Sequence, residues 1–113
     1  MKKDASVFID HILECIQLIE NYLKDKTKVD FMESVQLQDS VIRRIEIIGE
    51  AVKNIPNEFK SQYPKIPWDD IAGMRDILIH KYFGIDLELA WEAAVHDIPG
   101  LEKKLLQIKK DLE

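Results

Sequence analysis

The stretch "LQDSVIRRIEIIGEAVKNI", residues 37–55, decides the fold class of this chain. Its apolar residues recur at steps of three and four, which is the spacing of one face of an α-helix. Either Asp30 or Ser34 can cap such a helix, and the proline at position 56 ends it. We therefore predict a long amphipathic helix with an apolar stripe of Leu37, Val41, Ile45, Ile48, Val52 and Ile55.

The N-terminal segment, residues 4–24, shows the same helical spacing. Its stripe includes Cys15, the single cysteine of the chain, which we interpret as a small buried residue and not as a nucleophile. One cysteine cannot form an internal disulfide, and charged residues interrupt this segment before any signal peptide or membrane span could form. We therefore expect a cytoplasmic protein without a membrane contact.

The C-terminal half contains further helix signals. Three prolines between residues 56 and 67 predict a connector with a short helical turn at 57–62. We predict a third helix from Asp69 towards residue 84, a fourth helix capped by Asp86, and a last helix with Pro99 in its first turn. No segment indicates a strand, so the predicted fold is all-α: an antiparallel bundle of four to five main helices in a single domain, residues 1–113.

The charge of the chain limits its possible partners. The formal net charge is -5, which argues against a general surface for nucleic acids, because Lys and Arg supply most of the affinity for phosphate. Any contact with RNA must therefore be local. The three histidines lie on three different predicted helices without metal-ligand spacing, so neither a metal nor another cofactor is expected.

The segment "MRDILIHKY", residues 74–82, holds the candidate site. At about 100° per residue, Asp76 and His80 share a polar helix face, and Gly73 leaves room beside them. Arg75 lies about 140° from His80 on a regular helix, so the two side chains diverge within one chain. A long, distorted reach or a symmetric dimer could bring them together. Judged by geometry alone, a weak surface pair is the simpler interpretation.

Longer motifs add a resemblance to this geometry. The stretch "MRDILIHKYFGIDLELAW", residues 74–91, resembles the signature of the HEPN superfamily, and specifically of its HepT-like branch. In that branch an Arg, four intervening residues and a His are followed by a Tyr two positions later. "RIEIIGEAVKNIP", residues 44–56, and "YPKIPWDDIAGMRD", residues 63–76, resemble the long helix of that branch and its entry to the motif helix. The likeness covers essentially the whole chain.

This resemblance implies a homodimeric, metal-independent endoribonuclease toxin of a toxin–antitoxin pair, with an RNA substrate and a cleft at the dimer interface. Arg75 and His80 would be the catalytic pair, cleaving RNA by transesterification. Asp76 would be a supporting residue, where many relatives have Asn. Tyr82 would accept AMP from the partner protein, an MntA-type nucleotidyltransferase antitoxin, although packing at the helix end is an equal alternative for this tyrosine.

The main rival interpretation is a non-catalytic nucleotide-binding or protein-interaction module that pairs with a nucleotidyltransferase. A plain helical assembly protein is the third. Glu46 and Glu50 are best interpreted as a solvated or dimer-contact face, and Gly49 as a point of close helix packing. Trp68 and Trp91 are expected to anchor a core or an interface.

Overall fold

The computed structural model describes residues 2–79 and 86–112, without the side chains of residues 2–4, 75 and 77–79. All of the regular secondary structure in these two ranges is helical, which confirms the predicted all-α fold. The elements are α1 (Lys2–Leu23), α2 (Lys28–Glu33), α3 (Val35–Lys53), α4 (Asn57–Ser61), α5 (Trp68–Ile79), α6 (Leu87–Glu92), the π-helical segment η1 (Ala93–Asp97) and α7 (Ile98–Leu112).

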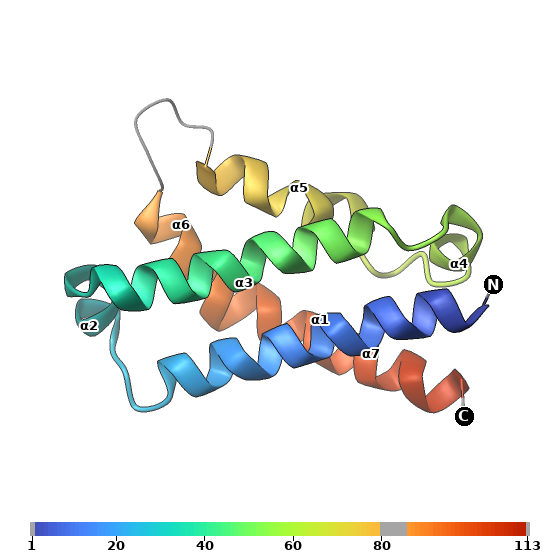
Figure 1. Ribbon diagram of the computed structural model, residues 1–113, viewed down its shortest axis with the longest axis horizontal. Helices are drawn as coiled ribbons and strands as arrows, with labels where there is room; N and C mark the ends of the chain where they lie inside the picture. Colours follow the sequence, from blue (N-terminus) through green and yellow to red (C-terminus); the bar gives the residue numbers. More distant parts are fainter. Residues whose placement is uncertain (1, 80–85, 113) are drawn as a thin grey trace.

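Each long helix runs antiparallel to the long helix before it in the chain (Figure 1). α1 and α5 point in one direction along the bundle, and α3 and the rod of α6, η1 and α7 point in the opposite direction. α1 therefore begins and α7 ends at the same end of the molecule, while α5 ends and α6 begins at the opposite end. None of the described helices is both long and apolar enough to cross a membrane.

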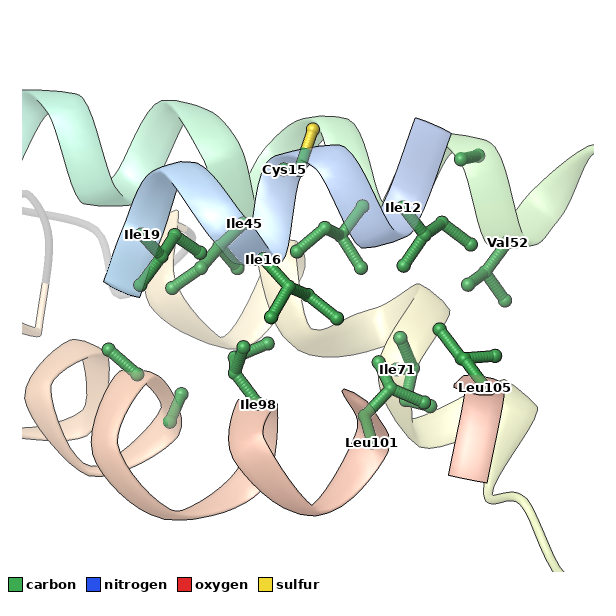
Figure 2. Close-up of a cluster of buried hydrophobic side chains, with 14 of the residues drawn as sticks. Ile12, Cys15, Ile16, Ile19, Ile45, Val52, Ile71, Ile98, Leu101 and Leu105 are labelled. Carbon is green, nitrogen blue, oxygen red and sulfur yellow. The ribbon is translucent and has the colours of Figure 1, made fainter. Parts of the chain in front are cut away.

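α3 forms in the segment predicted to be a long helix, and it packs against both α1 and α5. Ser34 caps it by accepting a hydrogen bond of 3.1 Å from the backbone N–H of Leu37. Asp30 is not the cap of α3; it belongs to the short helix α2, where it forms a reciprocal capping box with Thr27. The buried stripe of α3 meets isoleucines of α1 and apolar residues of α5 and α7, as Figure 2 shows. No described polar or charged side chain is buried.

The last two predicted helices are α6 and α7, and Pro99 lies in the first turn of α7 as predicted. The sequence did not predict that η1 joins the two helices into one continuous helical rod. Asp86 does cap the start of α6 by accepting a hydrogen bond of 3.0 Å from the N–H of Leu89. The chain then stays helical through η1 into α7. A proline lacks an N–H and crowds the carbonyl four residues earlier, whereas a π-helix is wider and bonds five residues apart. The π-helical segment before Pro99 therefore allows the backbone to remain helical from η1 into α7.

Candidate functional site

α5 is the helix on which the predicted catalytic segment begins. The backbone of Arg75 and the residue Asp76 lie in its last turns, and Asp76 is exposed. The Arg75 side chain, His80 and Tyr82 lie outside the described residues. The predicted approach of Arg75 to His80 and the predicted roles of all four residues therefore stay predictions.

The described part of α5 has a buried side and an open polar side. Ile71 is buried, and Ala72 and Met74 are half-buried against the core. Asp69, Gly73 and Asp76 follow one another at helical spacing, and both aspartates are exposed. A Cβ atom added at Gly73 would meet nothing within 4 Å. The polar face and the open space predicted beside Asp76 are therefore present as far as the described residues extend.

Two contacts fix the position of α5. Gly49 of α3 lies directly against it, because an added Cβ atom would be only 3.2 Å from the carbonyl oxygen of Ala72. This confirms the predicted close packing at Gly49. At the start of α5, the indole N–H of Trp68 donates to the carbonyl oxygens of Lys60 and Tyr63, both at 3.1 Å. The proline-rich connector and α3 thus hold the helix at both its end and its side.

α2 packs against α6, the helix that follows residues 80–85 in the sequence. Phe31 of α2 is fully buried and meets the ring of Trp91 at a centroid distance of 5.6 Å. Lys28 Nζ lies 2.6 Å from Glu88 Oε2, and this hydrogen bond raises the pKa of the lysine. The short helix was not predicted, although "TKVD", residues 27–30, contains its capping signal.

A groove of about 550 Å³ separates α5 from the rod of α6, η1 and α7. Its apolar floor consists of Ile71 and Met74 from α5 and Ala93 and Leu101 from the rod, and Leu89 lies at its edge. Sequence reasoning missed this groove, because its residues belong to stripes that look like ordinary core. Only the distance between α5 and the rod distinguishes these residues from core residues that are covered on every side.

The described histidines do not extend the predicted site. His11 and His96 are exposed, and His96 Nε2 lies 3.5 Å from Glu92 Oε1, one turn earlier. Within residues 2–79 and 86–112, no group of three or more His, Cys, Asp or Glu side chains is arranged to hold a metal ion.

Cys15 has the packing role that its sequence position predicts. It is fully buried, and burial raises the pKa of its thiol despite the opposing charge of Arg44. Arg44 Nη1 donates a weak hydrogen bond to its sulfur at 4.0 Å. A buried thiol that remains protonated is a poor nucleophile.

Glu102 of α7 and Glu20 of α1 form an unusual carboxyl pair. A hydrogen bond with Glu20, assisted by partial burial and by the negative charge of Glu20, raises the pKa of Glu102 to about 7. Below about pH 7 the Glu102 carboxyl group is therefore protonated in the folded protein. Farther along the same two helices, Lys109 Nζ forms an ion pair of 2.8 Å with Asp10 Oδ1.

Comparison with known proteins assigns the chain to a family. The family model described as "Ribonuclease HepT-like" matches residues 12–108. The chain belongs to this family. The matched region of the HepT-like chain contains all of α5, the rod as far as residue 108, and the predicted site residues 75–82.

Relatives of this HepT-like chain agree with the assignment. It is 58% identical, over all 113 of its residues, to a Methanocaldococcus jannaschii protein named "Gamma-glutamylcyclotransferase and putative RNase", and it spans 51% of that protein. It is 44% identical over 110 residues to "Probable ribonuclease HepT" from Thermococcus cleftensis, covering 97% of this chain and 100% of the relative. It is 47% identical over 107 residues to a "Putative RNase" from Caldanaerobacter subterraneus, covering 94% and 95% of the two chains. No solved structure matches significantly.

Proposed function

We propose that this HepT-like chain acts as a single domain and is a metal-independent endoribonuclease toxin of a toxin–antitoxin pair. The observation that carries the proposal is the family match over residues 12–108, which includes the complete Arg-x4-His-x-Tyr motif. The relatives whose names contain "ribonuclease" or "RNase" support RNA as the substrate. The firm packing of α5 against Gly49 supports a catalytic role, because a site needs a rigid element to hold its residues.

In the proposed reaction, the 2'-hydroxyl oxygen of RNA attacks the adjacent phosphorus, and the bond from phosphorus to the 5'-oxygen breaks. His80 takes the proton of the 2'-hydroxyl or donates one to the leaving 5'-oxygen, a role that suits histidine because the unperturbed pKa of this residue type is about 6.5. Arg75 binds the phosphate and stabilises the negative charge on its oxygens. The products are a 2',3'-cyclic phosphate and a 5'-hydroxyl.

We propose that a second copy of the chain completes this site. Arg75 and His80 diverge by about 140° on a regular helix, so a homodimer with two facing motifs would supply the missing partner for each. The face of Asp69, Gly73 and Asp76 supports such an arrangement, because it is polar and open beside Gly73. Asp76 would accept a hydrogen bond from His80 and fix its tautomer.

A partner protein is the second part of the proposal. Tyr82 would accept AMP from a nucleotidyltransferase antitoxin of the MntA type: its phenol oxygen attacks the α-phosphorus of ATP, loses its proton and displaces pyrophosphate. The added negative charge beside the site would repel RNA. Mass spectrometry after co-expression with such a transferase tests this step, and Tyr82→Phe should remove the added mass. An unmodified native tyrosine would contradict it.

Two observations favour the second candidate function, a non-catalytic nucleotide-binding or protein-interaction module that pairs with a nucleotidyltransferase, in its protein-interaction form. The open face of α5 carries two exposed aspartates, and the chain has a net charge of -5. Both features oppose the binding of a polyanion.

An RNA cleavage assay separates these two functions. We expect the native protein to cleave structured RNA in excess EDTA and to leave 2',3'-cyclic phosphate ends. Arg75→Ala and His80→Ala should each reduce the rate by at least about 100-fold. The matched controls Arg43→Ala and His11→Ala change exposed residues of α3 and α1 and should keep the native rate. Equal loss in the controls, or loss with EDTA, would contradict the mechanism; no cleavage by the native protein would support the module.

A further inference from the structure

The groove between α5 and the rod of α6, η1 and α7 has the features of a docking site. Leu89 is 38% exposed at its edge, and Met74 is only half-buried in its floor. The groove lies next to the polar face of α5, since Asp70 and Met74 alternate with Asp69 and Gly73 along the helix. The proposed catalytic face and the groove are therefore different surfaces of one helix.

Carboxylates stand on both walls of the groove. Asp70 lies on α5, and Glu92 and Asp97 lie on the opposite rod. Glu92 pairs with the exposed His96 at 3.5 Å, and Lys104 is the single Lys or Arg among the described residues that line the groove. This excess of negative charge beside an apolar floor disfavours RNA and favours a ligand with apolar and cationic groups.

The rod of α6, η1 and α7 forms one wall of the groove. η1 contributes Ala93, His96 and Asp97 to the lining, and its wider π-helical turn changes the direction of the side chains around it. At Gly100, also in the lining, an added Cβ atom would meet nothing within 4 Å. Residues 89–104 of the rod span about 22 Å at 1.5 Å per residue, which is the length of about four helical turns.

We propose that this groove binds an amphipathic helix of another protein, with an apolar stripe that packs on the floor and Lys or Arg side chains that flank it. Helices bind to grooves in this way when apolar residues recur at steps of three and four and the rims have complementary charge. The basic flanks would pair with Asp70 on one wall and with Glu92 and Asp97 on the other. This inference does not depend on ribonuclease activity.

A synthetic peptide tests the charge and the pattern separately. The probe is a fluorescent helical peptide with Leu at every third and fourth position and Lys on the flanks. Its controls are the same peptide with Glu in place of Lys, and a scrambled peptide of equal composition. We expect the full chain to bind the Lys peptide at least about tenfold more tightly than either control. Equal binding of the scrambled peptide would overturn the proposal, because only net charge would then matter.

Variants of the protein test the location. Asp70→Lys/Asp97→Lys should weaken binding at least about tenfold, whereas Asp39→Lys/Glu58→Lys should not. The two double variants change the charge equally, and each replaces one acidic residue in the first turn of a helix. Equal weakening by both would overturn the proposal.

Gly100→Phe should block the groove without loss of the fold, because the space beside Gly100 is open. We expect this variant to lose peptide binding while its sedimentation coefficient stays native. A change from dimer to monomer in Gly100→Phe would instead show that the groove is an interface between two copies of this chain. Such a change would refute the proposed partner.

Discussion

The substitution Gly49→Ala tests how closely α3 and α5 approach. In a helix, replacing glycine by alanine normally stabilises by about 1 kcal/mol. Here the new Cβ atom would lie 3.2 Å from the carbonyl oxygen of Ala72 and 3.6 Å from that of Ile71. These are backbone atoms of α5, so they can yield only if the helix moves. Overpacking of this kind costs about 1–3 kcal/mol, so we expect a net loss of about 1 kcal/mol.

Gly100→Ala is the matched control for this prediction. Gly100 is also helical, but its added Cβ atom meets nothing within 4 Å, so only the gain of up to about 1 kcal/mol remains. The two variants should therefore differ by about 2 kcal/mol in the free energy of unfolding, measured by urea denaturation. Gly49→Ala should melt below the native protein and Gly100→Ala above it. If Gly49→Ala melts at or above the native temperature, steric contact at this glycine does not set the helix spacing.

Three further predictions concern stability. Ile48 is fully buried in α3, so Ile48→Ala should lower the free energy of unfolding, measured by urea denaturation, by about 2–5 kcal/mol. Leu106 is 52% exposed, so Leu106→Ala should lower it by under about 0.5 kcal/mol. Similar losses in both variants would contradict the core assignment. Thr27→Ala removes the capping box of α2 and should lower the free energy of unfolding by about 1 kcal/mol, whereas Thr27→Ser keeps the hydroxyl and should avoid most of this loss. Equal losses in both variants would exclude the cap as the cause. Because the pKa of Glu102 is raised, the folded protein binds more protons than the unfolded chain between pH 4.5 and about 7. The stability that Glu102 contributes is therefore fully present below pH 4.5 and is lost as the pH rises through 7. Glu102→Gln should flatten this loss and stabilise the protein at pH 8 by less than about 1 kcal/mol, because the pair is partly exposed; an unchanged pH profile would exclude the raised pKa of Glu102.

Helical periodicity was sufficient to predict the main helices and the faces they bury. The predicted stripe of α3 is buried from Val41 to Val52. Asp86 caps the helix that it was expected to cap, and Ser34, one of two candidates, caps α3. Asp69, Gly73 and Asp76 also share an open face, since the positions of side chains around a helix follow directly from their spacing. Local geometry of this kind needs no knowledge of the rest of the fold.

Features that depend on the distance between helices could not be predicted in this way. Met74 and Leu101 pack on the core as their spacing predicts, but they also line a groove, because α5 and the rod do not close over them. Pro99 lies in the first turn of α7 as predicted, but nothing in the sequence predicted that η1 would join α6 to α7 without a break. This continuity depends on hydrogen bonds over five residues, which no residue type in "AAVHD", residues 93–97, specifies by itself.

The direction of the helices has a practical consequence for protein engineering. α1 begins and α7 ends at one end of the bundle, and α5 ends at the other (Figure 1). An affinity tag, a fluorophore or a surface linker attached at either terminus would therefore lie at the opposite end of the bundle from the end of α5. Immobilised protein should keep that end accessible to large ligands, whichever terminus carries the attachment.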